Sequence, residues 1–193
     1  MSHPQAAAKE PIDLREKGAA GQTGEKRLFM QLQVFTGCGN PQKLEDALKA
    51  SGLQSVLYLD LNDPQGIGVL FMSEDPADFA STVRDLLNAE PFSSLKHRPG
   101  LTMIGRTYST GHESDLEDWL LARNRRNVCN PAWPWAIWYP LRRKPEFSIL
   151  EPAEQGKVLR EHGTMGRAYG EAGHATDVRL ACHGIDTHDN EFV

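Results

Sequence analysis

The sequence predicts an α+β protein built from two ferredoxin-like units in tandem, the second of them apparently truncated. Strand and helix periods follow one another over residues 28–107 in the order βαββαβ, which is the order of one such unit. After residue 110 a helix and strand pattern begins the same order again. The chain has 193 residues, 39% of them apolar and 24% charged, which suits a globular protein of one large or two small domains.

Composition excludes several classes of protein. A net charge of -5 argues against a general nucleic-acid binder, which is normally basic. No apolar run is long enough for a membrane span, and the N-terminus lacks the apolar core of a signal peptide. The 3 Cys are widely spaced without a CxxC pair, so reduced thiols and a cytoplasmic location are expected rather than disulfides or zinc.

Three domains are expected, and the first is an arm. Residues 1–26 show no apolar period and are predicted to be disordered or loosely attached. Residues 27–110 are assigned to the first ferredoxin-like unit, without a cofactor. Residues 111–193 are assigned to the second, incomplete unit, which would carry the function.

The first unit begins with a strand over residues 28–34, where apolar and polar side chains alternate. Asn40 is predicted to cap the following helix, with Pro41 at its first position, and Gly52 to end it. Strands at 54–61 and 67–71, joined by turn residues, predict a hairpin. Ser73 is predicted to start a second helix, and residues 101–107 to form the fourth strand.

The second half opens with a helix predicted at Ser114, where Glu117 completes a capping box. The arginine-rich run at 123–126 is either a solvated helix end or a clamp for a ligand's carboxylates or phosphates, and the first reading is favoured. Residues 131–140 hold 3 of the 4 Trp and are predicted to form a strand covered on both faces. Pro152 then starts a long helix.

This long helix carries one histidine on its apolar face. Val158, His162, Met165 and Tyr169 recur at the spacing of a single helical stripe. The imidazole is either a satisfied core group or a ligand, and the sequence pattern alone leaves both open. Gly163 and Gly166 indicate either that something bulky approaches the backbone or that the helix bends or ends there.

The last elements leave the second unit unfinished. Residues 177–183 are predicted to form a strand, and Glu191–Val193 the first residues of another. A final helix and strand of the repeat are not in the sequence, so a fragment is suspected.

The C-terminal third resembles the chlorite dismutase family, which includes the coproheme decarboxylases. The resemblance depends on the order and spacing of short motifs rather than on any one of them, and it is clear over residues 135–193. The matching residues are Tyr139-Pro140, Glu161-His162-Gly163, Gly166-Arg167 with Tyr169, Gly184-Ile185-Asp186 and Glu191-Phe192.

This resemblance implies a dimeric α+β barrel made of the two units, and heme, either heme b or coproheme, as cofactor. The proximal iron ligand falls on His162, and imidazole is a normal axial donor. Val158 and Met165 would line the cofactor site, and Phe147 would be a pocket wall. Tyr139 falls on the tyrosine that decarboxylases use beside a porphyrin propionate, although it could equally be an aromatic core residue.

The distal side is expected to involve Asp177 and Arg179. The resemblance implies that an arginine steers chlorite in active chlorite dismutases, but Asp177 stands at that position and would repel an anion. Arg179 lies two residues on and therefore on the same strand face, so a register shift would let it serve instead. The alternative is that Asp177 and Arg179 form a surface pair.

The leading hypothesis is therefore a heme-dependent oxidoreductase that uses hydrogen peroxide, either a coproheme decarboxylase or a peroxidase-like enzyme. Rival hypotheses are a chlorite dismutase, a non-catalytic heme carrier or sensor, and a ligand-free module in which His162 is a core residue. The resemblance also implies a ring-shaped homo-oligomer, a homopentamer. No nucleic-acid partner and no membrane span are expected.

Overall fold

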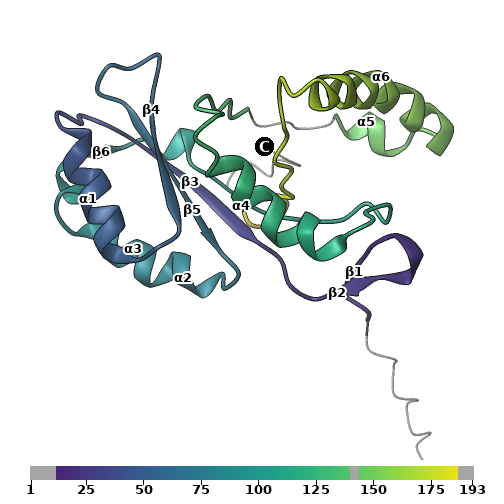
Figure 1. Cartoon of the computed structure of the whole chain (residues 1–193), viewed down its shortest axis with the longest axis horizontal. Coiled ribbons are helices and arrows are strands. Elements are labelled where there is room, and N and C mark those ends of the chain that lie inside the picture. Colours follow the sequence, from purple (N-terminus) through teal and green to yellow (C-terminus); the bar gives the residue numbers. More distant parts are fainter. Residues whose placement is uncertain (1–11, 140–143, 187–193) are drawn as a thin grey trace, which may run out of the picture.

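The structure, a computed structural model, describes residues 12–139 and 144–186 (Figure 1). Its strands are β1 (Glu16–Lys17), β2 (Thr23–Gly24), β3 (Phe29–Thr36), β4 (Ser55–Leu59), β5 (Ile67–Ser73), β6 (Lys96–His97) and β7 (Met103–Arg106). Its α-helices are α1 (Pro41–Ser51), α2 (Ala77–Ala80), α3 (Thr82–Asn88), α4 (Arg123–Val128), α5 (Pro145–Ser148) and α6 (Pro152–Glu171). A π-helix at Asp118–Ala122 leads directly into α4, and short 3-10 turns lie at Ala19–Gly21, Phe92–Ser94 and Pro99–Leu101.

An antiparallel sheet forms the centre of the molecule. Its strands lie in the order β4-β5-β3-β6, and β7 pairs with β3 on the same side as β6. Taken with the helices that connect the strands, this order is consistent with the ferredoxin-like unit predicted for residues 27–110. The mixed α+β class is confirmed, whereas the tandem arrangement and the barrel stay predictions.

Local sequence signals position α1 as predicted. The Asn40 side chain accepts a hydrogen bond from the Gln42 N–H at 3.1 Å, Pro41 occupies the first turn, and Gly52 ends the helix with φ of 69°. These devices satisfy backbone groups that a helix end leaves unpaired.

Both faces of the sheet are buried, and each face has its own core cluster. We call the first the helix-side core, because α1 and α3 cover it. Its buried members are Phe35, Cys38, Leu44, Leu48, Ile67, Val69, Phe71, Val83 and Phe92. We call the second the far-side core, and α4 lies on that side of the sheet in Figure 1. Its buried members are Leu28, Met30, Leu32, Val34, Leu70, Met72, Met103, Leu116, Leu120, Leu121, Leu180 and Cys182.

The far-side core crosses the predicted domain boundary. Five of its members, Leu116, Leu120, Leu121, Leu180 and Cys182, belong to the part of the chain assigned to the second unit. The division into three domains stays a prediction, but the first sheet does not bury its far face without these later residues.

Two predicted helix starts are wrong by short distances. Ser73 ends β5, and Asp75 instead accepts the Ala77 N–H at 2.9 Å; the chain then breaks at Ser81 into α2 and α3. The local reason is that the Ser73 hydroxyl donates to the Asp78 carboxylate at 2.5 Å and accepts the Asp75 N–H at 3.0 Å, so it does not cap the helix.

The capping box predicted at Ser114 is also wrong. Asp115 accepts the Asp118 N–H at 2.9 Å and begins that helix one residue later. Ser114 is engaged elsewhere, because its carbonyl accepts the Gln22 side chain at 2.8 Å.

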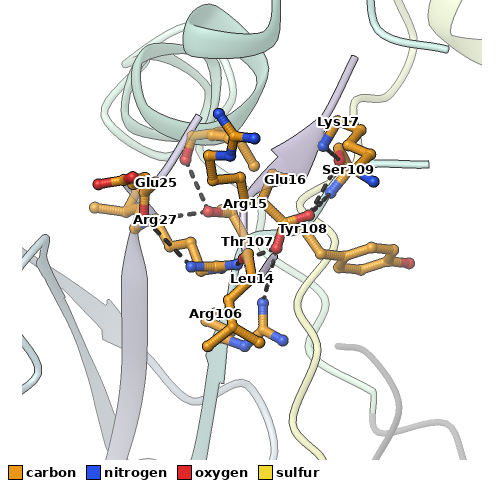
Figure 2. A network of polar contacts seen from close by, with 12 residues as sticks. Leu14, Arg15, Glu16, Lys17, Glu25, Arg27, Arg106, Thr107, Tyr108 and Ser109 are labelled. Carbon is orange, nitrogen blue, oxygen red and sulfur yellow. Dashed lines mark hydrogen bonds and ion pairs between the residues drawn. The ribbon is translucent and has the colours of Figure 1, made fainter. Parts of the chain in front are cut away.

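The predicted disordered arm is wrong for the described part of residues 1–26. Strands β1 and β2 pair antiparallel, and the Glu16 carboxylate links this hairpin to the sheet (Figure 2). Glu16 accepts from Arg27 Nε at 2.8 Å, from an Arg106 guanidinium N–H at 3.1 Å, and from both the N–H and the hydroxyl of Ser109 at 3.0 Å. Partial burial raises the pKa of Glu16, but the hydrogen bonds from Ser109 and Arg27 outweigh it, so the pKa lies below its usual range.

The second half departs most from its prediction. Residues 131–132 form a turn and 133–139 form no strand, because no described strand lies beside them and Pro131 and Pro134 lack a donor. The strand predicted over 177–183 is reduced to one bridge, in which Ala181 and Arg106 exchange hydrogen bonds of 3.0 and 2.8 Å. The alternation of side chains is nevertheless as predicted, since Leu180 and Cys182 are buried.

Some predictions fall outside the described residues. These are the strand expected at Glu191–Val193, Pro140 of the Tyr139-Pro140 motif, and residues 1–11 of the arm.

Candidate functional site

Helix α6 presents the predicted histidine, but on an exposed face. It spans 20 residues, and none of them is buried. The stripe of Val158, His162, Met165 and Tyr169 forms as the spacing predicts, and Val158, Met165 and Tyr169 are exposed to between 55% and 59%. No described element covers this face; in Figure 1, α6 lies beside α5 and apart from the sheet.

The exposure of this stripe bears on one of the two readings of His162, that of a core residue. A satisfied core histidine would be buried and hydrogen-bonded, whereas His162 lies among exposed residues. A side chain built at Gly163 or Gly166 would meet nothing within 4 Å. Gly166 follows His162 by one turn on the same face, so a flat group can approach the helix backbone beside the imidazole.

The donor set at α6 fits axial ligation of a porphyrin iron. One imidazole on an apolar helix face is what such ligation requires. Within the described residues, no group of three or more His, Cys, Asp and Glu side chains is arranged to hold a metal ion by itself. His162 is thus a single protein donor among apolar neighbours, which suits an iron whose other ligands come from a macrocycle.

The other expected cofactor residues lie before α6 in the chain. Tyr139 is 49% exposed at the end of segment 131–139, whose Trp135 and Ile137 are 73% and 84% exposed. Phe147 is half-buried in α5. Trp138, on the opposite side of the segment from Tyr139, packs against the far-side core. The described residues supply no second sheet that would bring Tyr139 and His162 into one pocket.

Asp177 and Arg179 form an ion pair, and Arg123 and Trp119, which sequence reasoning did not connect with them, join it. The Asp177 and Arg179 side chains pair at 3.0 Å, and Arg123 reaches Asp177 at 3.4 Å. The guanidinium carbons of Arg123 and Arg179 each lie 4.5 Å from the centre of the Trp119 ring. This arrangement links the C-terminal segment to the helix that carries Trp119, and it agrees with the alternative that Asp177 and Arg179 are a surface pair.

The arginines of the run at residues 123–126 also pair with carboxylates of the same chain. Arg125 pairs with Glu74 at 3.1 Å, and Arg126 pairs with Asp118 through bonds to both carboxylate oxygens. With Arg123 engaged by Asp177, each guanidinium of the run already has a carboxylate of its own chain. The structural reading of the run is therefore favoured over a ligand clamp.

The motif around Gly184 also has a structural role. The Asp186 carboxylate is 6% exposed and accepts the Ile104 N–H of β7 at 3.1 Å. Burial, together with the nearby Asp186 charge, raises the pKa of the Cys182 thiol to about 12. The segment around Leu180 packs closely against β7 at Gly105, where an added side chain would come within 2.6 Å of Leu180. Gly105 is the one residue in the sequence that could have indicated this contact.

Comparison with known proteins identifies the class. The C-terminal part of the chain matches a family of heme-related oxidoreductases that includes enzymes. The matching model is that of chlorite dismutase, and it covers residues 109–193. Over these residues the chain is similar to the chlorite dismutase family, as the motifs around His162 implied.

Two further findings complete the comparison. No match was found among curated proteins. Among the helices that the structure describes, none combines the length and apolar character that a membrane crossing needs.

Proposed function

We propose that the chain is a heme-binding protein of the chlorite dismutase family in which His162 supplies the axial ligand to iron. The observation that carries the proposal is the exposed stripe of α6, where the family's histidine stands among Val158, Met165 and Tyr169. Family members bind heme. An imidazole lone pair that projects from an apolar face is accessible to a porphyrin iron without any rearrangement of α6.

The remaining parts of the site follow from this assignment. Val158 and Met165 would contact the macrocycle on either side of the ligand, since both lie within one turn of His162. Phe147 would add an apolar wall, and Tyr139 would lie at the edge of the group, where a phenol can hold a propionate or pass on a proton. Heme or coproheme, when bound, supplies oxidative chemistry with hydrogen peroxide. A barrel closed by a second sheet, a homo-oligomeric ring and a cytoplasmic location belong to the same proposal.

The charges near Asp177 favour peroxide over chlorite. Asp177 pairs with both Arg123 and Arg179, so its negative charge opposes the binding of an anionic oxidant at either guanidinium. A neutral oxidant such as hydrogen peroxide is not subject to that repulsion. A catalytic role for Asp177 or Arg179 would require this cluster to open.

Heme titration of the full-length chain tests the ligand. We expect wild type to give a shifted Soret band and His162→Ala to lose it, with affinity reduced at least about tenfold. Added imidazole should restore the band in His162→Ala, because it refills the vacant axial position. The matched control is His112→Ala, which removes an exposed histidine far from α6 in the sequence and should bind like wild type. Equal binding by wild type and His162→Ala would refute the ligand assignment.

Activity assays then separate the members of the family. Coproheme with hydrogen peroxide should lose mass by decarboxylation in the decarboxylase, whereas chlorite should release dioxygen in a chlorite dismutase. Inactivity in both assays, with heme bound through His162, would favour a carrier or sensor. The open face of α6 in the chain makes this second candidate worth testing in the same experiment.

A further inference from the structure

Helix α6 ends in a motif that holds two rings together at one end of the His162 stripe. Gly173 adopts φ of 71°, and its N–H donates to the Gly170 carbonyl at 3.0 Å. The His174 N–H donates to the Tyr169 carbonyl, also at 3.0 Å. These are the two hydrogen bonds of a Schellman motif, in which a residue just outside the helix meets one in its last turn. The His174 ring accordingly lies edge-on to the Tyr169 ring, with the ring centres 6.3 Å apart.

Both rings carry hydrogen-bond donors that are open to a ligand. Tyr169 is 55% exposed, and His174 is exposed as well. Within residues 12–139 and 144–186, neither the Tyr169 hydroxyl nor a ring nitrogen of His174 has a hydrogen-bond partner. An imidazole keeps at least one ring N–H in either protonation state, and a phenol donates one hydrogen. The pair therefore offers two neighbouring donors to an acceptor from outside the chain.

Tyr169 lies on the same face of α6 as His162, two turns further along. Seven residues correspond to a rotation within about 20° of two full turns and to a rise of about 10.5 Å. Side chains of a helix lean toward its N-terminus, so the phenol leans back toward the imidazole. A porphyrin whose iron is bound by His162 would lie flat against this face, because an axial ligand is perpendicular to the macrocycle. Tyr169 would then lie beyond the central rings, level with the side chains at the edge of the macrocycle.

The two ends of the stripe differ in the charges beside them. Glu154 and Glu161 lie about 80° and 100° around α6 from His162, in the first half and the centre of the helix. Glu171, near the C-terminal end, lies about 180° away on the opposite side. Acids repel the carboxylates of a ligand, so those groups are placed more favourably toward the Schellman motif. The helix dipole favours the opposite order, but it is weak at an exposed site, and the motif already engages two terminal carbonyls.

We propose that Tyr169 and His174 hold a propionate carboxylate of the porphyrin that His162 binds, and that this contact orients the macrocycle along α6. The inference rests on the proposed function, since it requires ligation of the iron by His162. The Tyr169 hydroxyl and a His174 ring N–H each donate to the carboxylate, which gives charge-assisted hydrogen bonds. The edge of heme b that carries no carboxylate then lies toward Val158, at the apolar end of the stripe. Heme b has two propionates, so the contact expected at Tyr139 is not displaced.

Hemin and its dimethyl ester test the proposal, because esterification removes the carboxylate charges and keeps the iron and the macrocycle. In titrations of the full-length chain, Tyr169→Phe should lower the affinity for hemin about five- to tenfold and that for the ester less than about twofold. His174→Phe should act in the same way, since it keeps a ring against Tyr169 but has no ring N–H. The matched control is Thr164→Val, which removes a hydroxyl from the opposite face of α6 and should bind both ligands like wild type.

The position of the Soret band separates this contact from the iron ligand. It should be the same in wild type, Tyr169→Phe and His174→Phe, because His162 still binds the iron. A band that moves in Tyr169→Phe would overturn the proposal, since the phenol would then be an iron ligand. So would an equal loss of affinity for hemin and for its ester, or no loss for hemin. Failure of the proposed function would look different, because hemin would then bind wild type and His162→Ala alike, and that result would overturn both proposals.

Discussion

Helices α1 and α6 follow the same sequence rules and end in opposite environments. Both begin with a proline in the first turn and both carry an apolar stripe. Helix α1 buries Leu44 and Leu48 to 1% and 6% exposure, whereas no residue of α6 is buried. The difference lies in the neighbouring strands: β3 and β4 flank α1 in the chain and form the sheet beneath it, whereas the segments that flank α6 form no sheet in the described residues. Periodicity therefore predicts which face is apolar, and only a partner buries it.

The largest expected effect is on the free energy of unfolding, and it compares the apolar stripe of α1 with that of α6. Leu44→Ala should lower the free energy of unfolding by about 3 to 4 kcal/mol, because it leaves a cavity in a buried helix face. Met165→Ala on α6 should change it by less than about 0.5 kcal/mol, because Met165 is 55% exposed. Urea denaturation of the heme-free protein measures both. A large loss in Met165→Ala would show that the stripe is covered in solution, and the contrast would then fail.

A smaller effect comes from one substitution made at two glycines. In Gly105→Ala the new Cβ would lie 2.6 Å from Leu180 Cβ and 2.7 Å from Cys182 Sγ, so the docked segment must move. We expect a loss of about 1 to 3 kcal/mol. Gly163→Ala has open space around the new methyl group and should stabilise α6 by up to about 1 kcal/mol.

Thiol chemistry reports on the same pair of variants. In wild type the buried Cys182, with its pKa raised to about 12, should react slowly with a disulfide reagent. Gly105→Ala should speed that reaction, while Gly163→Ala should leave it unchanged. If Cys182 reacts at one rate in all three proteins, its segment does not dock at Gly105 in the way described.

The smallest expected effect is dependent on pH. Glu16→Gln should cost about 1 to 2 kcal/mol at pH 7, because it removes a charged acceptor from Arg27, Arg106 and Ser109. The pKa of Glu16 is lowered in the folded protein, so its stabilisation is complete above the ordinary value of 4.5 and is lost as pH falls through the folded value below it. The gap between wild type and variant should therefore stay constant from pH 7 to about 5.5 and close in acid.

The control for Glu16→Gln is a substitution in α6. Glu154→Gln changes an exposed glutamate in the first turn of α6 and should leave the unfolding free energy within about 0.5 kcal/mol of wild type at every pH. A gap between wild type and Glu16→Gln that persisted at low pH would mean that packing, rather than charge, joins the hairpin to the sheet.

How well the sequence predicts a structural element depends on how close in the chain the residues that determine it are. Asn40, Pro41 and Gly52 act on their own helix ends, so α1 was predicted almost to the residue. The run in β5 is apolar on both faces because both core clusters use it. The ion pairs of Glu16 join residues far apart in the chain, and no pattern near residue 16 announces them. That is why residues 12–26 were mistaken for an arm.

The candidate site shows the same limit. The spacing around His162 predicted the stripe and, with the family's motifs, the ligand. It did not predict that Trp119 would gather Arg123, Asp177 and Arg179, because that cluster requires two segments more than 50 residues apart in the chain, as the Arg123–Asp177 separation of 54 residues shows. The segment before α5 was predicted to be a strand from its alternating residues, but alternation does not supply the neighbouring strand that hydrogen bonds need.

The far-side core has a consequence for the order in which the protein is made. Leu28 and Cys182 belong to one cluster, so the first of these residues leaves the ribosome well before the last. The sheet strands are synthesised first and can pair early, but their far face stays partly bare until Leu180 and Cys182 emerge. During that interval the nascent chain exposes an apolar sheet face, which is the kind of surface that chaperones bind.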